Sequence, residues 1–550
     1  MSSPLATRIA ASELDSAFGS YLAGRVARHR RDTGAAARYF SRALADDPEN
    51  LNLLRQTYLS LHAEGRMDDA TRLAQRIVEL RPKEPIAGLT LAVEHIRNGE
   101  FAEARKQLGL AATQGYNTLL VPLLSAWAAA AQGDFDQAIK VLSTLNKSEA
   151  FAVFRELHAA LINDLAGNVE AAEKAYRFAV AAQPGGSFRV VAAFGAFYER
   201  LGKFDEARAL YAAYKKENPD STWFDRAMAR IAAHGKPERT VSNAREGAAE
   251  VLFGVASALH QENALEAALI YARLAIRLRP GFDAAYMLLG EILETQNRWA
   301  VAISAYDAIP PKSPLYWSAQ IRISANLDSL NRTNDAVEKL KNMARQRPER
   351  ADALITLGDL LRARERWSEA VAAYDQALER VKQRKRRHWR PLYARGISLE
   401  RAKQWPRAER DFLAALDLEP DQPFVLNYLG YSWVDKGINL DRALKMIERA
   451  VELRPHDGYI IDSLGWAQYR LGNYPASVAQ LERAVELKPD DPTINDHLGD
   501  AYWRVGRHIE ARFQWRRALA LGPQEADMTE KIEKKLRKGL PVATVADGTG

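Results

Sequence analysis

Aromatic, acidic and amide side chains recur at a spacing of four and three residues in three segments near the C-terminal end of the sequence. On an α-helix this spacing places the members of one set on the same face. Aromatic rings offer large contact areas at a low entropic cost, and carboxylates accept hydrogen bonds from the N–H donors of a partner. The combination therefore predicts binding of another molecule. The candidate partner-binding residues are Asn427, Tyr431, Asp462, Trp466, Tyr469, Asp496, Asp500 and Trp503.

Two interpretations of these rings are open from the sequence. They line a binding groove, or they pack between neighbouring helices, as aromatic residues at helical spacing commonly do. If they bind a partner, the carboxylates of Asp462 and Asp496 favour a basic or internal segment as the ligand. The same carboxylates would repel a free acidic C-terminus.

A second candidate site is a basic segment at residues 382–390, in which six of nine residues are Lys or Arg and a tryptophan is adjacent. Such a segment predicts contact with an anion such as a phosphate, an RNA or a lipid head group. The alternative, which we prefer, is a solvated loop whose cations lie at the end of a helix, where positive charge is favoured. The candidate anion contacts are Lys382, Arg384, Lys385, Arg386, Arg387 and Arg390.

The sequence has few features of an enzyme. It contains no cysteine in 550 residues, which excludes disulfides, zinc–thiolate sites, iron–sulfur clusters and cysteine nucleophiles. It also lacks the phosphate loop GxxxxGK[ST], the metal-binding HExxH and the GxSxG nucleophile elbow. The net charge of +7 is small for this length and does not by itself indicate nucleic-acid binding. We expect no catalysis, no cofactor and no metal.

Landmark residues recur with a period of about 34 along most of the chain. Pro455, Pro489 and Pro523 are 34 residues apart, and an alanine stands twelve residues before most of the recurring prolines, as at Ala443 and Ala511. The small residues let two helices approach closely, and the proline ends the second helix. This is the pattern of the helix–turn–helix tetratricopeptide repeat (TPR). Units begin near residues 17, 51, 85, 119, 153, 188, 249, 283, 317, 351, 389, 423, 458 and 492.

These units predict an all-α, right-handed TPR superhelical solenoid of about 14 repeats with a C-terminal capping helix. Residues 222–248 fit no unit, so we place a domain boundary there. The predicted segments are a leader at 1–16, an N-terminal array of about six repeats at 17–221, a linker at 222–248, a C-terminal array of about eight repeats at 249–525 with a basic insertion at 385–388, a capping helix at 526–538 and a disordered tail at 539–550.

The C-terminal run contains NYLGYS, DGYIIDSLGWA and NDHLGDAYWRVGR in this order. It resembles large alphaproteobacterial TPR proteins of the cell envelope and the related outer-membrane TPR lipoprotein adaptors. The match is close over roughly 389–525 and looser over the N-terminal units. The resemblance implies a scaffold that brings partner proteins together.

From these observations we expect a non-enzymatic scaffold or adaptor that binds proteins or peptide segments along the concave TPR groove. The resemblance implies a periplasmic or cell-envelope location if a signal was removed from the N-terminus, because MSSPLATRIAASELDS has no apolar core. Contact with a membrane would need an anchor that this sequence lacks. The alternative is a cytoplasmic regulatory or nucleic-acid-associated TPR protein that uses the basic segment at 382–390. The sequence identifies neither the partner nor the oligomeric state.

Overall fold

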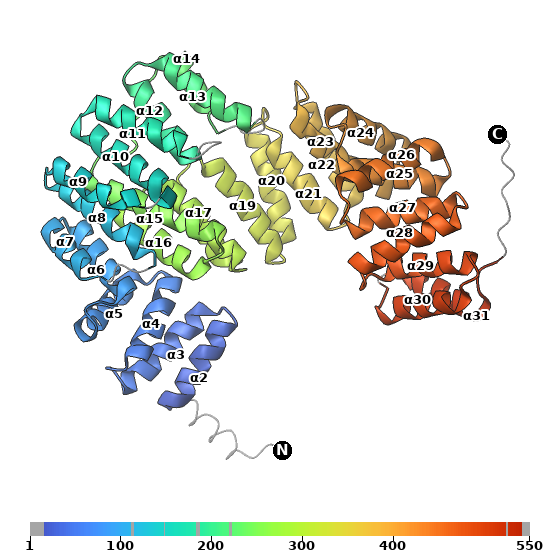
Figure 1. The fold of residues 1–550 in the computed structure, drawn as a ribbon, viewed down its shortest axis with the longest axis horizontal. Coiled ribbons are helices and arrows are strands. Elements are labelled where there is room, and N and C mark those ends of the chain that lie inside the picture. Colours follow the sequence, from blue (N-terminus) through green and yellow to red (C-terminus); the bar gives the residue numbers. More distant parts are fainter. Residues whose placement is uncertain are drawn as a thin grey trace. The chain divides into compact units, whose positions relative to one another are not determined.

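A computed structural model describes residues 16–111, 115–147, 149–182, 187–218, 223–523 and 526–541. Within these ranges the chain forms 30 α-helices and no β-strand (Figure 1). The predicted all-α TPR solenoid is therefore confirmed. Residues 1–15 of the predicted leader and residues 542–550 of the predicted tail lie outside the described residues.

Each repeat contributes a first helix, here called the A helix, and a second, the B helix. The first six pairs are α2 (Ala17–His29) and α3 (Thr33–Asp46), α4 (Leu51–Glu64) and α5 (Met67–Leu80), α6 (Pro85–Asn98) and α7 (Phe101–Leu110), α8 (Asn117–Ala131) and α9 (Phe135–Leu142), α10 (Ala152–Ala166) and α11 (Val169–Ala181), and α12 (Phe188–Arg200) and α13 (Phe204–Glu217). The extra helix α14 (Asp225–Ala232) follows, and 3₁₀ turns occupy Ser143–Lys147 and Glu149–Phe151.

The remaining pairs continue to residue 520. They are α15 (Ala244–Gln261) and α16 (Leu265–Leu278), α17 (Asp283–Thr295) and α18 (Trp299–Asp307), α19 (Tyr316–Ser329) and α20 (Thr333–Gln346), α21 (Asp352–Ala363) and α22 (Trp367–Glu379), α23 (Trp389–Arg401) and α24 (Trp405–Leu418), α25 (Pro423–Lys436) and α26 (Leu440–Leu453), α27 (Gly458–Arg470) and α28 (Tyr474–Leu487), and α29 (Pro492–Arg504) and α30 (His508–Ala520). Residues 526–538, expected to form a capping helix, are α31 (Ala526–Lys538).

The A helices begin within two residues of their predicted starts, with one exception. Helix α15 begins at Ala244 instead of residue 249. Its start is set by a cap, because the Asn243 side chain accepts a hydrogen bond of 3.0 Å from the backbone N–H of Glu246. Much of the predicted linker is therefore helical, in α14 and in the first turn of α15, and among its described residues 223–224 and 233–243 lack helix.

A glycine of the A helix packs against an aromatic ring of the B helix in several repeats. An ideal Cβ atom built on Gly290 would lie 2.3 Å from Tyr306, and one on Gly358 would lie 2.5 Å from Tyr374. Both rings are completely buried. A side chain at either glycine would therefore push the two helices of its repeat apart, because protein interiors are close-packed. The landmark glycines of the sequence thus report contacts inside each repeat.

The chain divides into two compact units at a place the sequence did not indicate. Unit 1 comprises residues 1–336 and unit 2 residues 337–550, so the division falls inside α20 and not at 222–248. The predicted boundary is wrong because the helices that follow residues 222–248 pack back onto the array that precedes them. Helix α15 packs against α6, α8 and α10, and α16 packs against α4 and α6 (Figure 1).

In unit 1 the helices covered by α15 and α16 are A helices, and we call the surface formed by α4, α6, α8 and α10 the A-helix face of unit 1. Ion pairs reinforce the apolar contact: Arg277 donates to Glu94 over 2.9 Å and also pairs with Asp68. Arg189 donates to Glu250 over 3.0 Å. The apolar side chains that α15 buries include Val251, Leu252, Val255 and Leu259.

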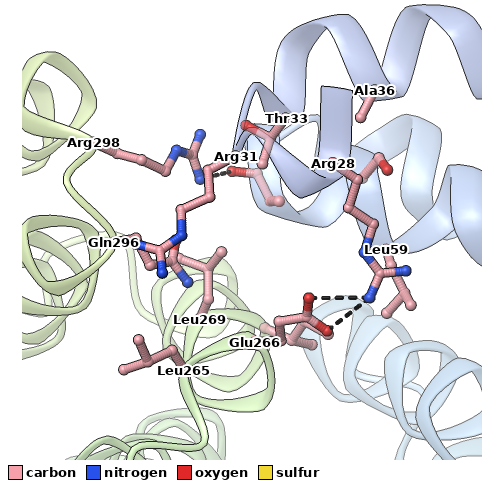
Figure 2. Close-up of a pocket in the computed structure, with 13 residues that line it drawn as sticks. Arg28, Arg31, Thr33, Ala36, Leu59, Leu265, Glu266, Leu269, Gln296 and Arg298 are labelled. Atoms are coloured by element: carbon pink, nitrogen blue, oxygen red, sulfur yellow. Dashed lines mark hydrogen bonds and ion pairs between the residues drawn. The ribbon is translucent and has the colours of Figure 1, made fainter. Parts of the chain in front are cut away.

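A cavity of about 240 Å³ remains where this contact meets the first repeats (Figure 2). Leu59 of α4 and Leu265 and Leu269 of α16 line its apolar part. Across it, Arg28 donates to both carboxylate oxygens of Glu266 at 3.1 and 3.2 Å. Packing between α16 and the first repeats is thus completed at the edge by an ion pair.

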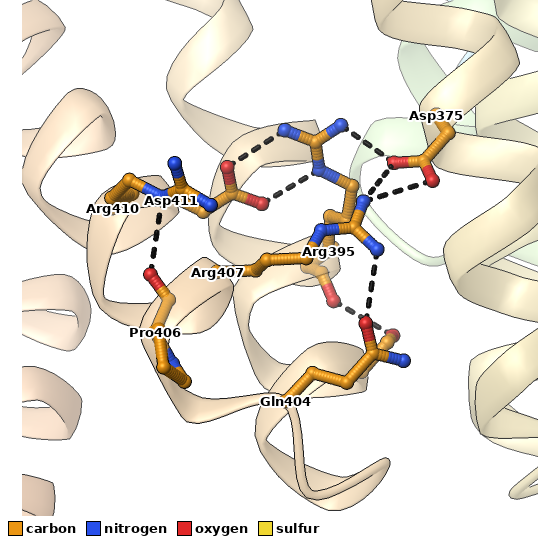
Figure 3. A network of polar contacts seen from close by, with 9 residues as sticks. Asp375, Arg395, Gln404, Pro406, Arg407, Arg410 and Asp411 are labelled. Atoms are coloured by element: carbon orange, nitrogen blue, oxygen red, sulfur yellow. Dashed lines mark hydrogen bonds and ion pairs between the residues drawn. The ribbon is translucent and has the colours of Figure 1, made fainter.

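Unit 2 contains its own polar network, which joins α22, α23 and α24 (Figure 3). Arg395 donates to both oxygens of Asp411, at 2.6 and 2.7 Å, and to Asp375 at 2.8 Å. Arg407 adds two further bonds to Asp375, at 3.0 and 2.9 Å. Asp411 is buried, so the guanidinium of Arg395 compensates a carboxylate that has left water.

Candidate functional site

The predicted partner-binding residues lie on three neighbouring A helices of unit 2. Asn427 and Tyr431 are on α25, and α25 and α27 pack side by side, as do α27 and α29. We call the surface formed by α21, α23, α25, α27 and α29 the A-helix face of unit 2. The structure therefore places the eight residues on three adjacent helices, and their contact with a partner stays a prediction. Their surroundings differ from one helix to the next.

Asp462 of α27 already has a partner within the chain. Its carboxylate oxygens lie 2.9 and 3.2 Å from Nδ1 of His497 on α29, and both residues are buried. Burial opposes a charge on the imidazole and so lowers the pKa of His497. The negative charge of Asp462, with contributions from the more distant Asp496 and Asp500, outweighs the effect of burial, so the pKa of His497 is raised. The carboxylate of Asp462 is thus held inside the repeats by a histidine.

Asp496 and Asp500 are also buried, and they share one lysine from the capping helix. Lys535 of α31 donates to Asp496 at 2.7 and 2.9 Å and to Asp500 at 2.8 Å. The indole N–H of Trp515 gives Asp500 a further hydrogen bond of 2.8 Å. Burial and the neighbouring Asp496 raise the pKa of Asp500. The basic ligand expected for these carboxylates is therefore supplied by the chain itself.

Trp503 packs under the segment that follows α31. An ideal Cβ atom on Gly539, whose φ is +71°, would lie 2.0 Å from the indole ring. The carbonyl of Pro541 accepts a hydrogen bond of 2.7 Å from Arg504. Residues 539–541, which the sequence assigns to a disordered tail, thus cover this end of the face. Trp503 is thus packed on one side by this segment and, like Trp466, stays half-buried, so its contact with a partner stays a prediction.

Trp466 and Tyr469 form a stack on α27. Their ring centroids are 4.8 Å apart with an interplanar angle of 7°, and Trp466 also stacks on His497 at 4.1 Å and 17°. The Tyr469 hydroxyl accepts a hydrogen bond of 3.1 Å from Arg504. Trp466 is nevertheless only half-buried. Two rings of the chain therefore stack on the indole of Trp466, and part of its side chain still faces solvent.

Asn427 and Tyr431 complete the accessible part of the face. Both are half-buried. Oδ1 of Asn427 is shielded from solvent and accepts no hydrogen bond from any other residue in the described part of the chain. Buried acceptors are normally satisfied, so this oxygen could gain a donor from a ligand only if the Asn427 side chain turned outward. With Trp466, these residues make a surface of two rings and one amide.

Unit 1 contains a tryptophan–histidine pair at the positions equivalent to Trp466 and His497, which was not predicted from the sequence; its rings meet edge to face at 88° instead of stacking. Trp127 of α8 donates from its indole nitrogen to Nδ1 of His158 on α10 over 3.1 Å, and both side chains are buried. In each pair the tryptophan is the ninth residue of a unit and the histidine is the sixth residue of the next. A comparison of the units position by position would have found this recurrence.

Trp127 is covered by the helix that fills the A-helix face of unit 1. An ideal Cβ atom on Gly247 of α15 would lie 2.3 Å from the indole ring. The two copies of the pair thus differ in their cover: α15 lies on Trp127, whereas Trp466 has no helix from outside its neighbouring repeats packed extensively on it in the described part of unit 2.

The basic segment at 382–390 contains a short 3₁₀ turn, Arg386–His388. Arg386 donates to Glu419 over 2.9 Å and lowers the pKa of that carboxyl. The guanidinium of Arg390 lies 5.7 Å from the Trp389 ring centroid. Four of the predicted anion contacts are exposed between residues 382 and 386: Lys382, Arg384, Lys385 and Arg386. Arg387 is half-buried, and contact of this segment with an anion stays a prediction.

Among the residues that the structure describes, no three His, Cys, Asp or Glu side chains are arranged to hold a metal ion. No helix in the described ranges combines the length and the apolar character needed to cross a membrane.

Comparisons with known proteins identify repeats along much of the chain. The tetratricopeptide repeat family matches residues 21–85, 166–222, 275–316, 329–395, 393–458 and 465–506. The TPR repeat-containing protein PA4667 of Pseudomonas aeruginosa is 28% identical over 191 residues, which are 34% of this chain and 32% of that protein. The chain thus spans about a third of the length of this curated relative.

Two solved structures are similar over most of the chain. The Cut9–Hcn1 hetero-tetramer of APC/C is 15% identical, with 90% of this chain and 96% of that chain covered and a TM-score of 0.39. Yeast Tom70 is 14% identical, with 95% of each chain covered and a TM-score of 0.34.

Proposed function

The chain belongs to the tetratricopeptide repeat proteins, and from that premise we propose that it is a non-enzymatic scaffold that binds partner proteins on the A-helix face of unit 2. TPR arrays present extended surfaces, which suit protein binding better than the enclosed pockets typical of small-molecule chemistry. The binding surface consists of Asn427, Tyr431 and Trp466.

The observation that carries this proposal is the difference in cover between the two faces. The A-helix face of unit 1 holds α15 and α16 of the same chain. In unit 2 the corresponding rings of Tyr431 and Trp466 stay half-buried. Half-buried aromatic rings beside an acceptor that lacks a donor are the composition of a protein-binding hot spot.

The charge of the expected partner follows from the ion pairs already present. Asp462 is paired with His497, and Asp496 and Asp500 are paired with Lys535. A basic ligand would have to displace these partners, whereas an apolar ligand would not. We therefore assign the affinity to ring contacts and to the Asn427 amide, in place of the acidic stripe inferred from the sequence.

We further propose that the scaffold works in the cell envelope. This proposal rests on the resemblance of the C-terminal repeats to envelope TPR proteins. Fractionation of cells that express the full open reading frame tests this location. Recovery of the protein only with the cytosol would contradict it.

Site-directed cross-linking tests the binding face directly. Since the chain has no cysteine, a single substitution such as Tyr431→Cys can carry one photo-reactive label. A matched control is Phe513→Cys, because Phe513 is 60% exposed on the B helix α30. We expect the same partner to cross-link from residue 431 and not from residue 513. The purified partner should then bind the Trp466→Ala chain at least about tenfold more weakly, the loss expected for one aromatic contact. Cross-linking from residue 513 alone would contradict the proposed face.

A further inference from the structure

We propose that the cavity between α16 and the first repeats of unit 1 binds a small carboxylate that carries an apolar group. The carboxylate lies at Arg31 and the apolar group lies on Leu265 and Leu269, which line the same cavity. This site lies within unit 1 and is independent of the A-helix face of unit 2. It therefore adds a ligand to the protein-binding role proposed above.

Apolar side chains form one part of the cavity wall. Ala36 of α3 and Leu269 and Ile270 of α16 are buried, and Leu59 of α4 and Leu265 of α16 are half-buried. Ligand sites are typically apolar cavities with a few polar groups that orient the ligand. The volume of about 240 Å³ equals that of about eight water molecules at about 30 Å³ each. The cavity therefore accommodates a short alkyl chain or a branched side chain.

Three arginines line the polar part of the cavity, and two of them have acidic partners. Arg28 donates to Glu266 over 3.1 Å, and Arg298 donates to Glu64 over 2.9 Å. Arg31 makes no ion pair within the described part of the chain. One unmatched positive charge on the wall favours a ligand with one negative charge. A carboxylate supplies one such charge, whereas a phosphate group carries nearly two at neutral pH.

The backbone holds Arg31 in the turn between α2 and α3 in the left-handed conformation. Its φ is +60°, which is unfavourable for a residue with a side chain. Most repeats have glycine or asparagine at this position of the turn, as at Gly65 and Asn297. The Arg31 side chain extends toward α16 and α17, whose Leu269 and Gln296 line the same cavity (Figure 2). This turn thus brings the unmatched charge to the cavity.

Two further guanidinium groups meet at the edge of the cavity. Nη1 of Arg298 and Nη2 of Arg273 both donate to the backbone carbonyl of Ala63, over 3.0 and 2.9 Å. Burial and the charge of Arg298 lower the pKa of Arg273 to about 10, although Glu64 opposes the shift. Two cations thus share one carboxylate, and their excess positive charge attracts an anion bound in the cavity.

The test titrates the full-length chain with hexanoate, which combines one carboxylate with a short alkyl chain. 1-Hexanol lacks the charge and acetate lacks the chain, so each probes one half of the site. Arg31→Gln removes the unmatched cation, and Leu265→Phe fills the apolar part. The matched control is Arg30→Gln, because Arg30 is exposed in the same turn and does not line the cavity. Isothermal titration calorimetry measures binding, and circular dichroism checks that each variant keeps its helicity and melting temperature.

We expect saturable binding of hexanoate with a dissociation constant of about 1 mM or lower. 1-Hexanol and acetate should bind at least about tenfold more weakly, because each makes only half of the contacts. Arg31→Gln and Leu265→Phe should each weaken hexanoate binding at least about tenfold, and Arg30→Gln should leave it unchanged.

The C-terminal end of a polypeptide offers the same chemistry as a free acid, and a tripeptide distinguishes these sources. Competition of acetyl-Gly-Gly-Leu, but not of its amide, with hexanoate would support the site and assign it to a polypeptide end. Binding of hexanoate alone would support it as a site for free acids. Absence of hexanoate binding at about 10 mM, equal binding of 1-hexanol, or binding that neither Arg31→Gln nor Leu265→Phe changes would overturn the proposed site. The scaffold function assigned to unit 2 is tested separately by cross-linking from residue 431.

Discussion

In unit 1 the A-helix face is buried under α15 and α16, whereas in unit 2 the same kind of face keeps half-buried rings, among them Tyr431 and Trp466. The repeats that build the two faces follow one pattern, down to a tryptophan and a histidine at equivalent positions. The difference therefore comes from which other helices the chain places on the face. It teaches that a TPR surface can serve as an internal core in one part of a chain and as an exterior surface in another.

The largest expected effect is the loss of stability when the buried tryptophan of unit 1 is removed, compared with removal of the equivalent tryptophan of unit 2. Trp127 is completely buried between its repeat and α15, so Trp127→Ala should lower the stability of unit 1 by about 3–5 kcal/mol. Trp466 is only half-buried, so Trp466→Ala should cost unit 2 about 1 kcal/mol. Hydrogen exchange measured by mass spectrometry during denaturant titration assigns each loss to its unit. Equal losses in the two variants would remove the distinction between core and surface.

The polar network of unit 2 gives the next largest effect. Arg395→Ala leaves the buried Asp411 without its guanidinium partner, and we expect a loss of about 3 kcal/mol confined to unit 2. Arg407→Ala is the matched control, because this side chain is 40% exposed and should cost less than about 1 kcal/mol. Denaturant unfolding followed by the same exchange measurement checks both. Destabilisation of unit 1 by Arg395→Ala would show that the units do not unfold separately.

The pH dependence should have opposite signs in the two units. Burial lowers the pKa of His158 to about 3. Below pH 6.5 this histidine is therefore protonated in the unfolded chain but stays neutral in folded unit 1. Unit 1 should lose about 2 kcal/mol from this group between pH 7 and pH 5. The pKa of His497 is raised, so its contribution is complete below pH 6.5 and is lost as the pH rises through the folded value. Unit 2 should therefore gain stability as the pH falls toward about 6.

Unfolding of each unit, followed by hydrogen exchange at pH 5, 6, 7 and 8, measures these slopes. Asp462→Asn removes the carboxylate that raises the pKa of His497 and should abolish the part of the slope that this histidine gives unit 2, while Asp500, whose pKa is raised by burial, keeps its own part. His158→Phe should reduce the slope of unit 1 in the acid range, and the rest should come from the buried His62, whose pKa is also lowered to about 3 by burial. Slopes of the same sign in both parent units would mean that the environment of one histidine is wrongly assigned.

The smallest expected effect comes from glycine-to-alanine changes, which test whether α15 has to approach Trp127 closely. The control is a glycine that has room around it. Gly109 of α7 has no atom within 4 Å of an ideal Cβ position, so Gly109→Ala should stabilise its helix by up to about 1 kcal/mol. Gly247→Ala at the Trp127 ring should instead destabilise unit 1, since the added methyl group meets the indole. Thermal unfolding of the two variants gives the comparison. Stabilisation by both would show that α15 does not need its glycine.

The repeats could be predicted from the sequence because their landmarks report contacts inside one repeat. Gly290 and Tyr306 are sixteen residues apart and touch in the structure, so a period in the sequence is enough to locate them. The location of most A helices followed from such pairs. Helix α15 differs because its start depends on the cap formed by Asn243, which lies outside the repeat pattern.

Which segments pack on the two A-helix faces could not be predicted from the repeat period. Gly247 and Trp127 are 120 residues apart, and nothing periodic links a glycine to the ring that it covers. The partnership of Lys535 with Asp496 and Asp500 is also long-range, and it turned a stripe of apparently available carboxylates into buried ion pairs. The sequence thus places the eight candidate residues on one face, but their accessibility depends on which distant segments fold over them.

The cavity of about 240 Å³ between α16 and the first repeats has a mechanical consequence. The space opens to solvent, so Leu59, Leu265 and Leu269 have packing partners on one side only and contribute fewer contacts than side chains inside the repeats. A pulling force applied across this contact should therefore separate α16 from the early helices before the interiors of the repeats yield. Force would in this way expose the A-helix face of unit 1 without heat, acid or denaturant.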